Sequence, residues 1–375
     1  MSCESASLSR RSFLQASTMA SAAFALHVVT EPILAYAAAP EHPPDSVLIN
    51  ANENPLGPCG AAREAVLAIT PNSGRYLMHA TSEFEKQFAQ SVGVKDEQVS
   101  IFAGSTPALN FTVRAFCSPQ ASYVTADPGF EAGLFAAEAA KARVVKVPLT
   151  KTYAHDVKAM IAAAPDAGVF YVCNPNNPTG TLTSHSDIEY LLEHKPKSSI
   201  VMVDEAYIHF SDAPSAIDLV KAGKDLIVLR TFSKLYGMAG LRCGFAIARP
   251  DLLEKIYNYG GGNFMPVTAV AAASASLSEP NLVEKRKDIN TQVRTATFQW
   301  LDSNGYRYIP SQANFFLLDT KHPGKELIAA MAQEKVIIGR VWPSMPTYSR
   351  ITIGTSQEME RFQAALQKAM KGSAG

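Results

Sequence analysis

The chain lacks an excess of charge of either sign, because 34 lysines and arginines balance 34 aspartates and glutamates among its 375 residues. Proteins that bind nucleic acid or an acidic membrane through their overall charge carry a basic surplus, and this sequence has none. Internal repeats and low-complexity segments are also missing. Hydrophobic residues make up 47% of the chain, enough for a large core. The composition indicates a soluble globular protein with no nucleic-acid partner.

Cysteine is scarce and widely spaced, with five residues in the whole chain. Their positions, 3, 59, 117, 173 and 243, form no close pair of the kind that holds a metal or builds a disulfide framework. We therefore expect no metal site. Cys173 and Cys243 lie in or beside apolar runs, which favours small buried thiols over disulfides there.

A strongly apolar run of about twenty residues, the length that a membrane-spanning helix needs, is absent near the amino terminus. Residues 15–30 are only mildly apolar and rich in alanine and serine, and they follow a twin-arginine sequence that contains Arg10 and Arg11. Small residues at Ala35 and Ala37 have the spacing that a signal peptidase reads, so the mature chain should begin near Ala38. We expect export to the periplasm through the twin-arginine machinery. A basic extension of a cytoplasmic enzyme is the alternative.

Strand-like apolar runs alternate with helical patterns through the middle of the chain. The runs cover residues 99–102, 122–126, 143–147, 169–173, 200–204, 226–230 and 244–248. This alternation predicts an α/β domain with a mostly parallel seven-stranded sheet, which binds ligands beyond its strand ends. Helical patterns at 267–278 and 283–303 precede short strands near 308, 315–318, 336–339 and 351–353. These, with the stretch before about Tyr76, predict a smaller domain.

One lysine stands just past the strand at 226–230. Residues 231–244 read TFSKLYGMAGLRCG, with Lys234 between the hydroxyls of Thr231 and Ser233 and followed by glycines and Arg242. Hydroxyls and a guanidinium can bind a phosphate, while the glycines let the backbone approach closely. The set suits a phosphate-bearing aldehyde held beside a Schiff-base lysine, which indicates pyridoxal phosphate (PLP) as the cofactor. A solvated loop lysine is the ordinary alternative for such a position.

Two further strand ends strengthen this interpretation. The run at 169–173 leads into NPNNPTG, where Asn177 could donate to the phenolic oxygen of the pyridoxal ring. The run at 200–204 ends in Asp204, whose charge would keep the pyridine nitrogen protonated, and Tyr207 would bond the same phenolic oxygen. A polar turn and a helix cap are the structural alternatives.

Together these segments resemble the fold-type I, class I and II PLP-dependent aminotransferases, and most closely the histidinol-phosphate aminotransferase group. The resemblance extends to residues 48–57 (LINANENPLG), with Asn54 as a candidate substrate contact, and to Tyr76, which in that group reaches the cofactor phosphate of the neighbouring subunit. It also includes residues 349–355, where Arg350 corresponds to the arginine that holds the substrate carboxylate. The resemblance implies a homodimer. The implied organisation is a signal peptide (1–37), an arm (38–75), a large PLP-binding domain (76–265) and a small domain (266–375).

Some positions depart from that pattern or carry weaker signals. Gly104, Ser105 and Thr106 stand in a glycine-rich turn into a helix, where relatives often have acidic residues in place of Thr106 and Pro107. Backbone amides at such a helix start can still bind a phosphate. Phe130 stands where the family stacks an aromatic ring on the pyridoxal ring. Arg340 matches an arginine that contacts substrate phosphate, with a solvated edge-strand charge as the alternative.

The expected reaction is transfer of an amino group from an amino acid or amino-phosphate to a 2-oxo acid, with Lys234 moving the proton. A neutral lysine is required, and both desolvation and the nearby Arg242 favour the neutral form. A PLP-dependent decarboxylase or lyase of the threonine-phosphate decarboxylase type is the alternative, and a non-enzymatic PLP-binding protein is less consistent with the full residue set. Because no motif encodes the side-chain pocket, the sequence leaves the donor and the acceptor open.

Overall fold

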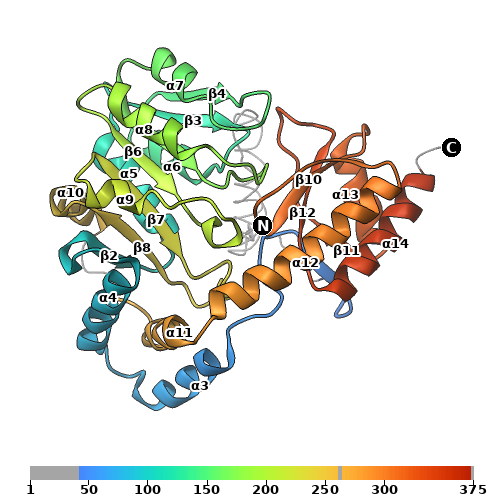
Figure 1. The fold of residues 1–375 in the computed structure, drawn as a ribbon, viewed down its shortest axis with the longest axis horizontal. Helices are drawn as coiled ribbons and strands as arrows, with labels where there is room; N and C mark the ends of the chain where they lie inside the picture. Colours follow the sequence, from blue (N-terminus) through green and yellow to red (C-terminus); the bar gives the residue numbers. More distant parts are fainter. Residues whose placement is uncertain (1–41, 261–263, 373–375) are drawn as a thin grey trace, which may run out of the picture. The chain divides into compact units, whose positions relative to one another are not determined.

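A seven-stranded sheet forms the framework of the larger part of the fold (Figure 1). The computed structural model describes residues 42–260 and 264–372. The strands lie in the order β2-β8-β7-β6-β5-β3-β4, and β8 alone runs opposite to the other six strands of this sheet. Their bounds are β2 (Val99–Phe102), β3 (Ser122–Asp127), β4 (Val144–Pro148), β5 (Ala167–Cys173), β6 (Ile200–Asp204), β7 (Leu226–Thr231) and β8 (Gly244–Ala248). The predicted mostly parallel seven-stranded sheet is confirmed, with each predicted run in place.

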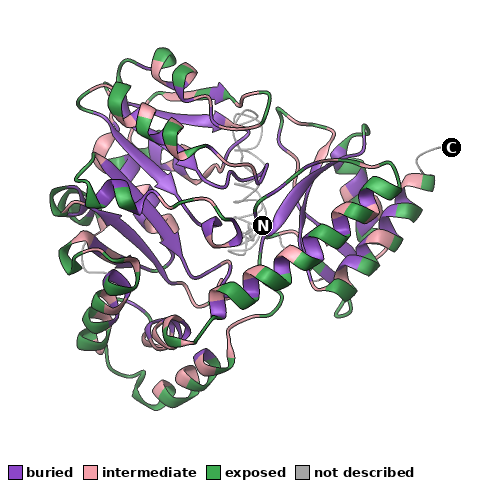
Figure 2. Cartoon of the chain, viewed as in Figure 1, coloured by how far each residue is buried: buried purple, intermediate pink, exposed green. Residues whose placement is uncertain are grey.

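Both faces of this sheet are buried, which explains why its strands read as continuous apolar runs (Figure 2). Successive side chains of a strand point to opposite faces, so Val201 and Val203 of β6 enter one core cluster and Ile200 and Met202 enter the other. The first cluster is covered by α4 (Met78–Val92), α7 (Val157–Ala163), α8 (His185–His194), α9 (Ile217–Lys221) and α11 (Val267–Ser278). The second is covered by α5 (Ser105–Phe116), α6 (Ala132–Ala139) and α10 (Pro250–Gly260).

The smaller part combines both ends of the described chain. Strand β1 (Val47–Ile49) pairs in parallel with β11 (Val336–Ile338), and an antiparallel sheet has the order β12-β10-β9. Helices α12 (Leu282–Ser303), α13 (Gly324–Gln333) and α14 (Ser356–Gly372) pack on these strands around a third core cluster. The strands are β9 (Arg307–Ile309), β10 (Phe315–Asp319) and β12 (Tyr348–Thr352). The early strand β1 thereby anchors the segment that follows it, residues 50–57, beside the carboxyl-terminal strands.

Two helices near the predicted domain boundary pack together beside the large sheet. Helix α11 has the predicted bounds 267–278 and lies against α3 (Gly60–Ile69), and the alanines of both helices enter the first core cluster. Small side chains allow such close helix contact. The remaining short helices are the 3₁₀ turns η1 (Thr70–Asn72), η2 (Asp96–Gln98) and η3 (Ile208–Phe210).

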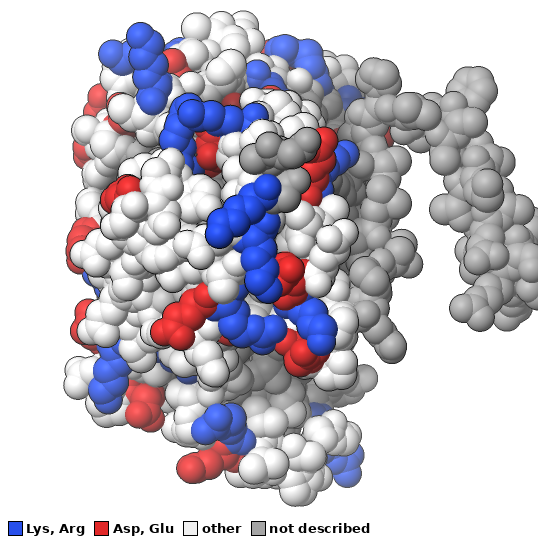
Figure 3. Space-filling model, turned by 90° about the vertical axis from the view of Figure 1, so that its right-hand side faces the viewer, with Lys and Arg blue, Asp and Glu red and all other residues white. Residues whose placement is uncertain are grey.

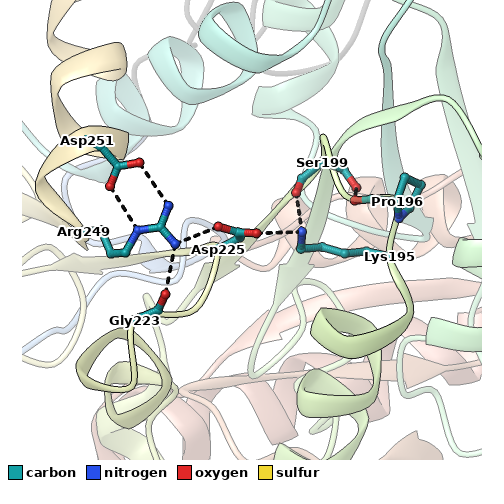
Figure 4. Close-up of polar contacts among 7 residues, drawn as sticks. All are labelled: Lys195, Pro196, Ser199, Gly223, Asp225, Arg249 and Asp251. Atoms are coloured by element: carbon teal, nitrogen blue, oxygen red, sulfur yellow. Dashed lines mark hydrogen bonds and ion pairs between the residues drawn. The ribbon is translucent and has the colours of Figure 1, made fainter.

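A charged cluster fixes the starts of β6 and β7 (Figure 4). Asp225 accepts from Lys195 Nζ at 3.1 Å and from Arg249 Nη1 at 2.7 Å, and Arg249 also pairs with Asp251. Because β5, β6 and β7 are parallel, this cluster lies at the opposite edge of the sheet from Asp204 and Lys234. Its charges stabilise the framework without contacting the candidate site.

The charged surface residues and the cysteines of the described chain agree with its balanced charge and its scarce, widely spaced cysteines. On the face drawn in Figure 3, basic side chains are interspersed with acidic ones. Within residues 42–260 and 264–372, none of the helices combines the length and the hydropathy that crossing a membrane requires. Cys59, Cys117, Cys173 and Cys243 are free, and the last three are buried. The prediction of small buried thiols at Cys173 and Cys243 is confirmed.

Candidate active site

The predicted site residues converge at one edge of the large sheet, beyond the ends of β5, β6 and β7. Asp204 ends β6, Lys234 follows β7, and Asn177 follows β5. The segment 50–54, which follows β1, passes over this edge and contacts all three of Lys234, Tyr207 and Arg350. The site is therefore built from loops of the large sheet and closed by a segment that the small part anchors.

Lys234 is half-buried with its amine directed at this segment. Its Nζ donates to the carbonyl oxygen of Ala51 at 3.2 Å and lies 5.7 Å from the centroid of the Tyr207 ring. Burial lowers the pKa of Lys234 to about 8, and the positive charges of Arg350 and Arg242 act in the same direction. An amine with this pKa is partly neutral near pH 7 to 8 and can accept a proton there. The direction agrees with the sequence analysis, which did not foresee the contribution of Arg350.

Asp204 and Glu205 are adjacent buried carboxylates with different partners. Asp204 accepts from the Tyr171 hydroxyl at 2.9 Å and from the Ala206 amide at 3.1 Å, both neutral donors. Burial raises the pKa of Asp204 to about 6. Glu205 instead pairs with Arg230 at 2.7 Å. Because a buried carboxylate with only neutral donors gains most from a nearby cation, Asp204 is the one of the two suited to a bound pyridinium.

Tyr207 is oriented by a residue that the sequence analysis did not single out. Asn52 Nδ2 donates to the Tyr207 hydroxyl oxygen at 3.1 Å, so the hydroxyl proton is left to donate elsewhere. Asn52 is buried, and its backbone has left-handed dihedral angles (φ 55°), which asparagine tolerates. Its backbone N–H donates to Thr352 Oγ1 at 2.9 Å. Its membership of the Asn-Glu-Asn-Pro segment was the only sequence signal for this role.

Arg350 on β12 is held in a fixed position beside Asn177. Its Nη1 donates to Asn177 Oδ1 and its Nη2 to the carbonyl oxygen of Asn50, each at 2.8 Å. The guanidinium lies 5.7 Å from the Phe315 ring centroid and 5.4 Å from that of Trp342. Burial lowers the pKa of Arg350 to about 10. Within the described residues no hydrogen-bond acceptor reaches its buried Nε, so the guanidinium keeps a donor that suits an anion.

A second group of donors surrounds the start of α5. Arg242 donates from Nη1 to Ser233 Oγ at 3.3 Å and to the Ala239 carbonyl at 2.8 Å, and Ser233 also bonds Thr231. Gly104 caps α5 at φ 87°, and a Cβ there would lie 2.1 Å from Arg242 Nη2. Only glycine leaves room for the guanidinium beside the free amides of the first helical turn.

The residues of this second group fit a phosphate. Ser105 and Thr106 lie half-buried in the first turn of α5, and no side chain caps that turn. Amides at a helix start, two hydroxyls and a guanidinium form the donor set that a phosphate prefers. With Lys234 and Asp204 alongside, the chain has groups for the phosphate, the aldehyde and the ring nitrogen of PLP. These residues are therefore the ones that would hold the cofactor.

The remaining predicted residues have other surroundings in this chain. Tyr76 is 71% exposed and lies 4.7 Å from the Phe264 ring, centroid to centroid. Asn54 donates to the Leu235 carbonyl at 2.8 Å and accepts from its own loop. Phe130 is half-buried in the loop after β3, packed on the second core cluster. Arg340 is ion-paired with Glu131. Substrate contacts of Asn54 and Arg340, and the ring stacking of Phe130, stay predictions.

A metal would need a different constellation. Among the residues that the structure describes, histidine, cysteine, aspartate and glutamate side chains form no group of three or more that could hold one. Two histidines of the large part have other partners: half-buried His209 contacts Arg230, and buried His155 contacts Thr183.

Comparison with known proteins agrees with this geometry. The aminotransferase class I and II family model matches residues 44–366. A histidinol-phosphate aminotransferase of Moorella thermoacetica is 33% identical over 336 residues, covering 87% of this chain and 86% of the relative. An aromatic amino acid aminotransferase of Cutibacterium acnes is 33% identical over 335 residues, covering 88% and 94%.

Solved structures support the same fold. The histidinol-phosphate aminotransferase of Sinorhizobium meliloti, determined in complex with pyridoxal-5'-phosphate, superposes with a TM-score of 0.81 over 93% of this chain and 96% of its own, at 22% identity. That identity speaks for the fold alone. The family match, the relatives and the site residues all agree. The chain therefore belongs to the aminotransferase class I and II family and is a PLP-dependent aminotransferase.

Proposed function

We propose that this aminotransferase works outside the cytoplasm as a homodimer, moving an amino group from an amino acid or amino-phosphate to a 2-oxo acid. The observation that carries the reaction is the amine of Lys234, which lies 3.2 Å from the Ala51 carbonyl oxygen and 5.7 Å from the Tyr207 ring centroid, and whose pKa burial lowers to about 8. Histidinol phosphate is a cytoplasmic biosynthetic intermediate, so export favours another donor. The place of action rests on the amino-terminal sequence, which lies outside the described residues.

Each site residue has its own role in the proposed reaction. PLP, when bound, supplies an electron sink for the charge that develops at the donor's alpha carbon. With PLP bound, the neutral Lys234 amine would accept the donor's alpha proton at Nζ and later release it. Anionic Asp204 favours a protonated ring nitrogen, and Arg350 holds the donor carboxylate through a guanidinium that Asn177 and the Asn50 carbonyl keep in place. The segment 50–54 contacts Lys234 through the Ala51 carbonyl and Tyr207 through the Asn52 side chain, which helps to fix both.

The half-reaction tests this function directly. Holoenzyme mixed with candidate amines should gain the absorbance of pyridoxamine phosphate, and addition of 2-oxoglutarate or pyruvate should restore the original spectrum. The amines should include aromatic, aliphatic and phosphate-bearing donors. Release of carbon dioxide from the donor without formation of a 2-oxo acid would instead establish the decarboxylase alternative.

An exposed aromatic surface supports the proposed dimer. The rings of Tyr76 and Phe264 contact each other at an interplanar angle of 35°, and Met78 and Tyr257 line the same hollow of about 230 Å³. These four side chains are between 49% and 71% exposed. Large apolar side chains gathered in this way mark a surface that another protein covers. In a homodimer, Tyr76 would be free to reach the cofactor phosphate of the other subunit.

Hybrid dimers test the shared site. Lys234→Ala and Tyr76→Phe chains should each be inactive alone, because one lacks the amine and the other lacks the phosphate contact. Refolded together, they should regain activity at one site of each hybrid, since the two defects then fall in one site and leave the other intact. Enzyme assays on the mixture, with each chain refolded alone as the control, measure this. A monomer in sedimentation would refute the shared site.

Export depends on Arg10 and Arg11 in our proposal. The twin-arginine route carries folded proteins, so PLP can be loaded in the cytoplasm before transit. Replacing both arginines with lysine should leave a folded, active and uncleaved enzyme in the cytoplasm. The unaltered chain should be found outside the inner membrane, beginning near Ala38. Fractionation and amino-terminal sequencing measure both outcomes. A wild-type protein that keeps Met1 and fractionates with cytoplasmic markers would favour the cytoplasmic alternative.

A further inference from the structure

The segment 339–345, which follows β11, is fastened onto the loop 127–131 after β3. Trp342 Nε1 donates to the Gly129 carbonyl at 3.2 Å, and the indole is buried. Ser344 Oγ donates to Asp127 Oδ1 at 3.0 Å. The loop comes from the large sheet and the segment from the smaller part, so these bonds fix one wall of the site where the two meet.

A salt bridge belongs to the same wall. The Arg340 guanidinium pairs with the Glu131 carboxylate, and it lies 4.5 Å from the centroid of the Trp342 ring. The side chains of Arg340 and Glu131 are 21% and 18% exposed, so water screens the pair only in part. Arg340 is therefore a cation whose charge is already balanced by a neighbour inside the protein.

This pair is next to the residue that holds the donor carboxylate. The Arg350 amide donates to the Arg340 carbonyl at 3.3 Å, and the guanidinium of Arg350 lies 5.4 Å from the Trp342 ring. Burial is the main reason that the pKa of Arg350 is lowered, but the charges of Arg340 and Glu131 both act on it. Glu131 also directly follows Phe130. A donor whose carboxylate sits on Arg350 thus places its side chain close to the pair.

We propose that Glu131 is a specificity-determining residue: it occupies the anion-binding position of Arg340 and selects donors with uncharged side chains over donors that carry a phosphate or a second carboxylate. An anionic donor would have to displace Glu131 and leave a partly buried carboxylate without its partner. An uncharged donor leaves the salt bridge intact. This inference deepens the proposed function and rests on it for the position of the donor.

The test compares Glu131→Gln with the unaltered holoenzyme on two donors that differ only in the phosphate, histidinol and histidinol phosphate. The ratio of kcat/KM for histidinol phosphate to kcat/KM for histidinol should rise at least tenfold in Glu131→Gln. A Glu138→Gln variant, which removes an exposed carboxylate from nearby α6, is the matched control and should leave the ratio unchanged. In the double variant Glu131→Gln/Arg340→Gln the ratio should return to the wild-type value, because the cation that binds the phosphate is then missing.

A binding measurement separates this proposal from the proposed function. The chain has two tryptophans, so a Trp300→Phe background leaves Trp342 as the single reporter beside the salt bridge. Fluorescence titration of holoenzyme with inorganic phosphate should show at least tenfold tighter binding in Glu131→Gln. This arm needs no turnover, so it stands even if no amine is transaminated. Equal phosphate affinity with and without Glu131, or an unchanged donor ratio, would overturn the proposal.

Discussion

Replacing Lys234 with alanine should abolish transamination and the visible absorbance of the lysine–cofactor linkage. Lys234 is the lysine whose charge acts on Asp204 and whose amine lies 5.7 Å from the Tyr207 ring centroid. Loss of a group that bonds covalently and moves the proton should reduce turnover by roughly 10⁴-fold or more. PLP should still bind noncovalently, because Arg242, Ser233 and the start of α5 would keep the phosphate.

Absorbance spectra, equilibrium dialysis of PLP and steady-state rates measure these three outcomes. Lys224→Ala is the matched control, since Lys224 is an exposed lysine just before the same strand, β7. It should keep both the spectrum and the rate. Turnover near the wild-type level in Lys234→Ala would remove Lys234 from the mechanism.

The large sheet was predictable because burial on both faces leaves a strong pattern. Each of its strands appears in the sequence as a short apolar run. Nine of the fourteen observed strand ends coincide with the predicted ones, four differ by one residue and the start of β5 differs by two. The site residues at its edge were predictable for a related reason. Asp204 ends one such run, Asn177 and Lys234 each stand four residues after one, and parallel strands bring their carboxyl ends to the same side of the sheet.

Contacts between distant segments left no comparable pattern. The bond from Asn52 to Tyr207 joins residues 155 positions apart, and the salt bridge of Arg340 joins it to a glutamate 209 positions away. Local sequence predicts a charged or polar residue at these positions without naming its partner. The alanine-rich helix α11 is a similar case, because periodicity gave its bounds but not the helix, α3, against which it packs.

For Arg350 the sequence predicted the residue but not its surroundings. A motif placed it as the carboxylate-binding arginine, but its surroundings come from four separate segments: Asn50 and Asn177 bond it, and Phe315 and Trp342 lie against it. These neighbours bury the guanidinium, and burial lowers its pKa to about 10. The same charge helps lower the pKa of Lys234. The residue that we propose to bind the substrate thus also lowers the pKa of the proposed proton acceptor, which no linear motif could indicate.

The adjacent acids Asp204 and Glu205 offer a test that separates catalysis from stability. Asp204→Asn should reduce kcat by about 10²–10³-fold, the scale of losing one preorganised electrostatic group, while the protein stays folded. Glu205→Gln removes the partner of buried Arg230 and should lower the free energy of unfolding by about 3–5 kcal/mol. Activity per folded molecule should fall far less than in Asp204→Asn. Kinetics and denaturant unfolding of both variants measure this contrast.

The pH dependence of the stability of the cofactor-free protein gives a separate test of Asp204. Its pKa is raised by burial from 3.8 to about 6, so between these values the folded chain holds a proton that the unfolded chain has lost. The contribution of Asp204 to stability is therefore full below about pH 4 and falls as the pH rises to about 6. Asp204→Asn should remove this decline, whereas Glu205→Gln should retain it. If both variants kept the decline, Asp204 would not be the acid whose pKa is raised by burial. Its proposed role beside the ring nitrogen would then be wrong, and the expected loss of kcat would have no basis.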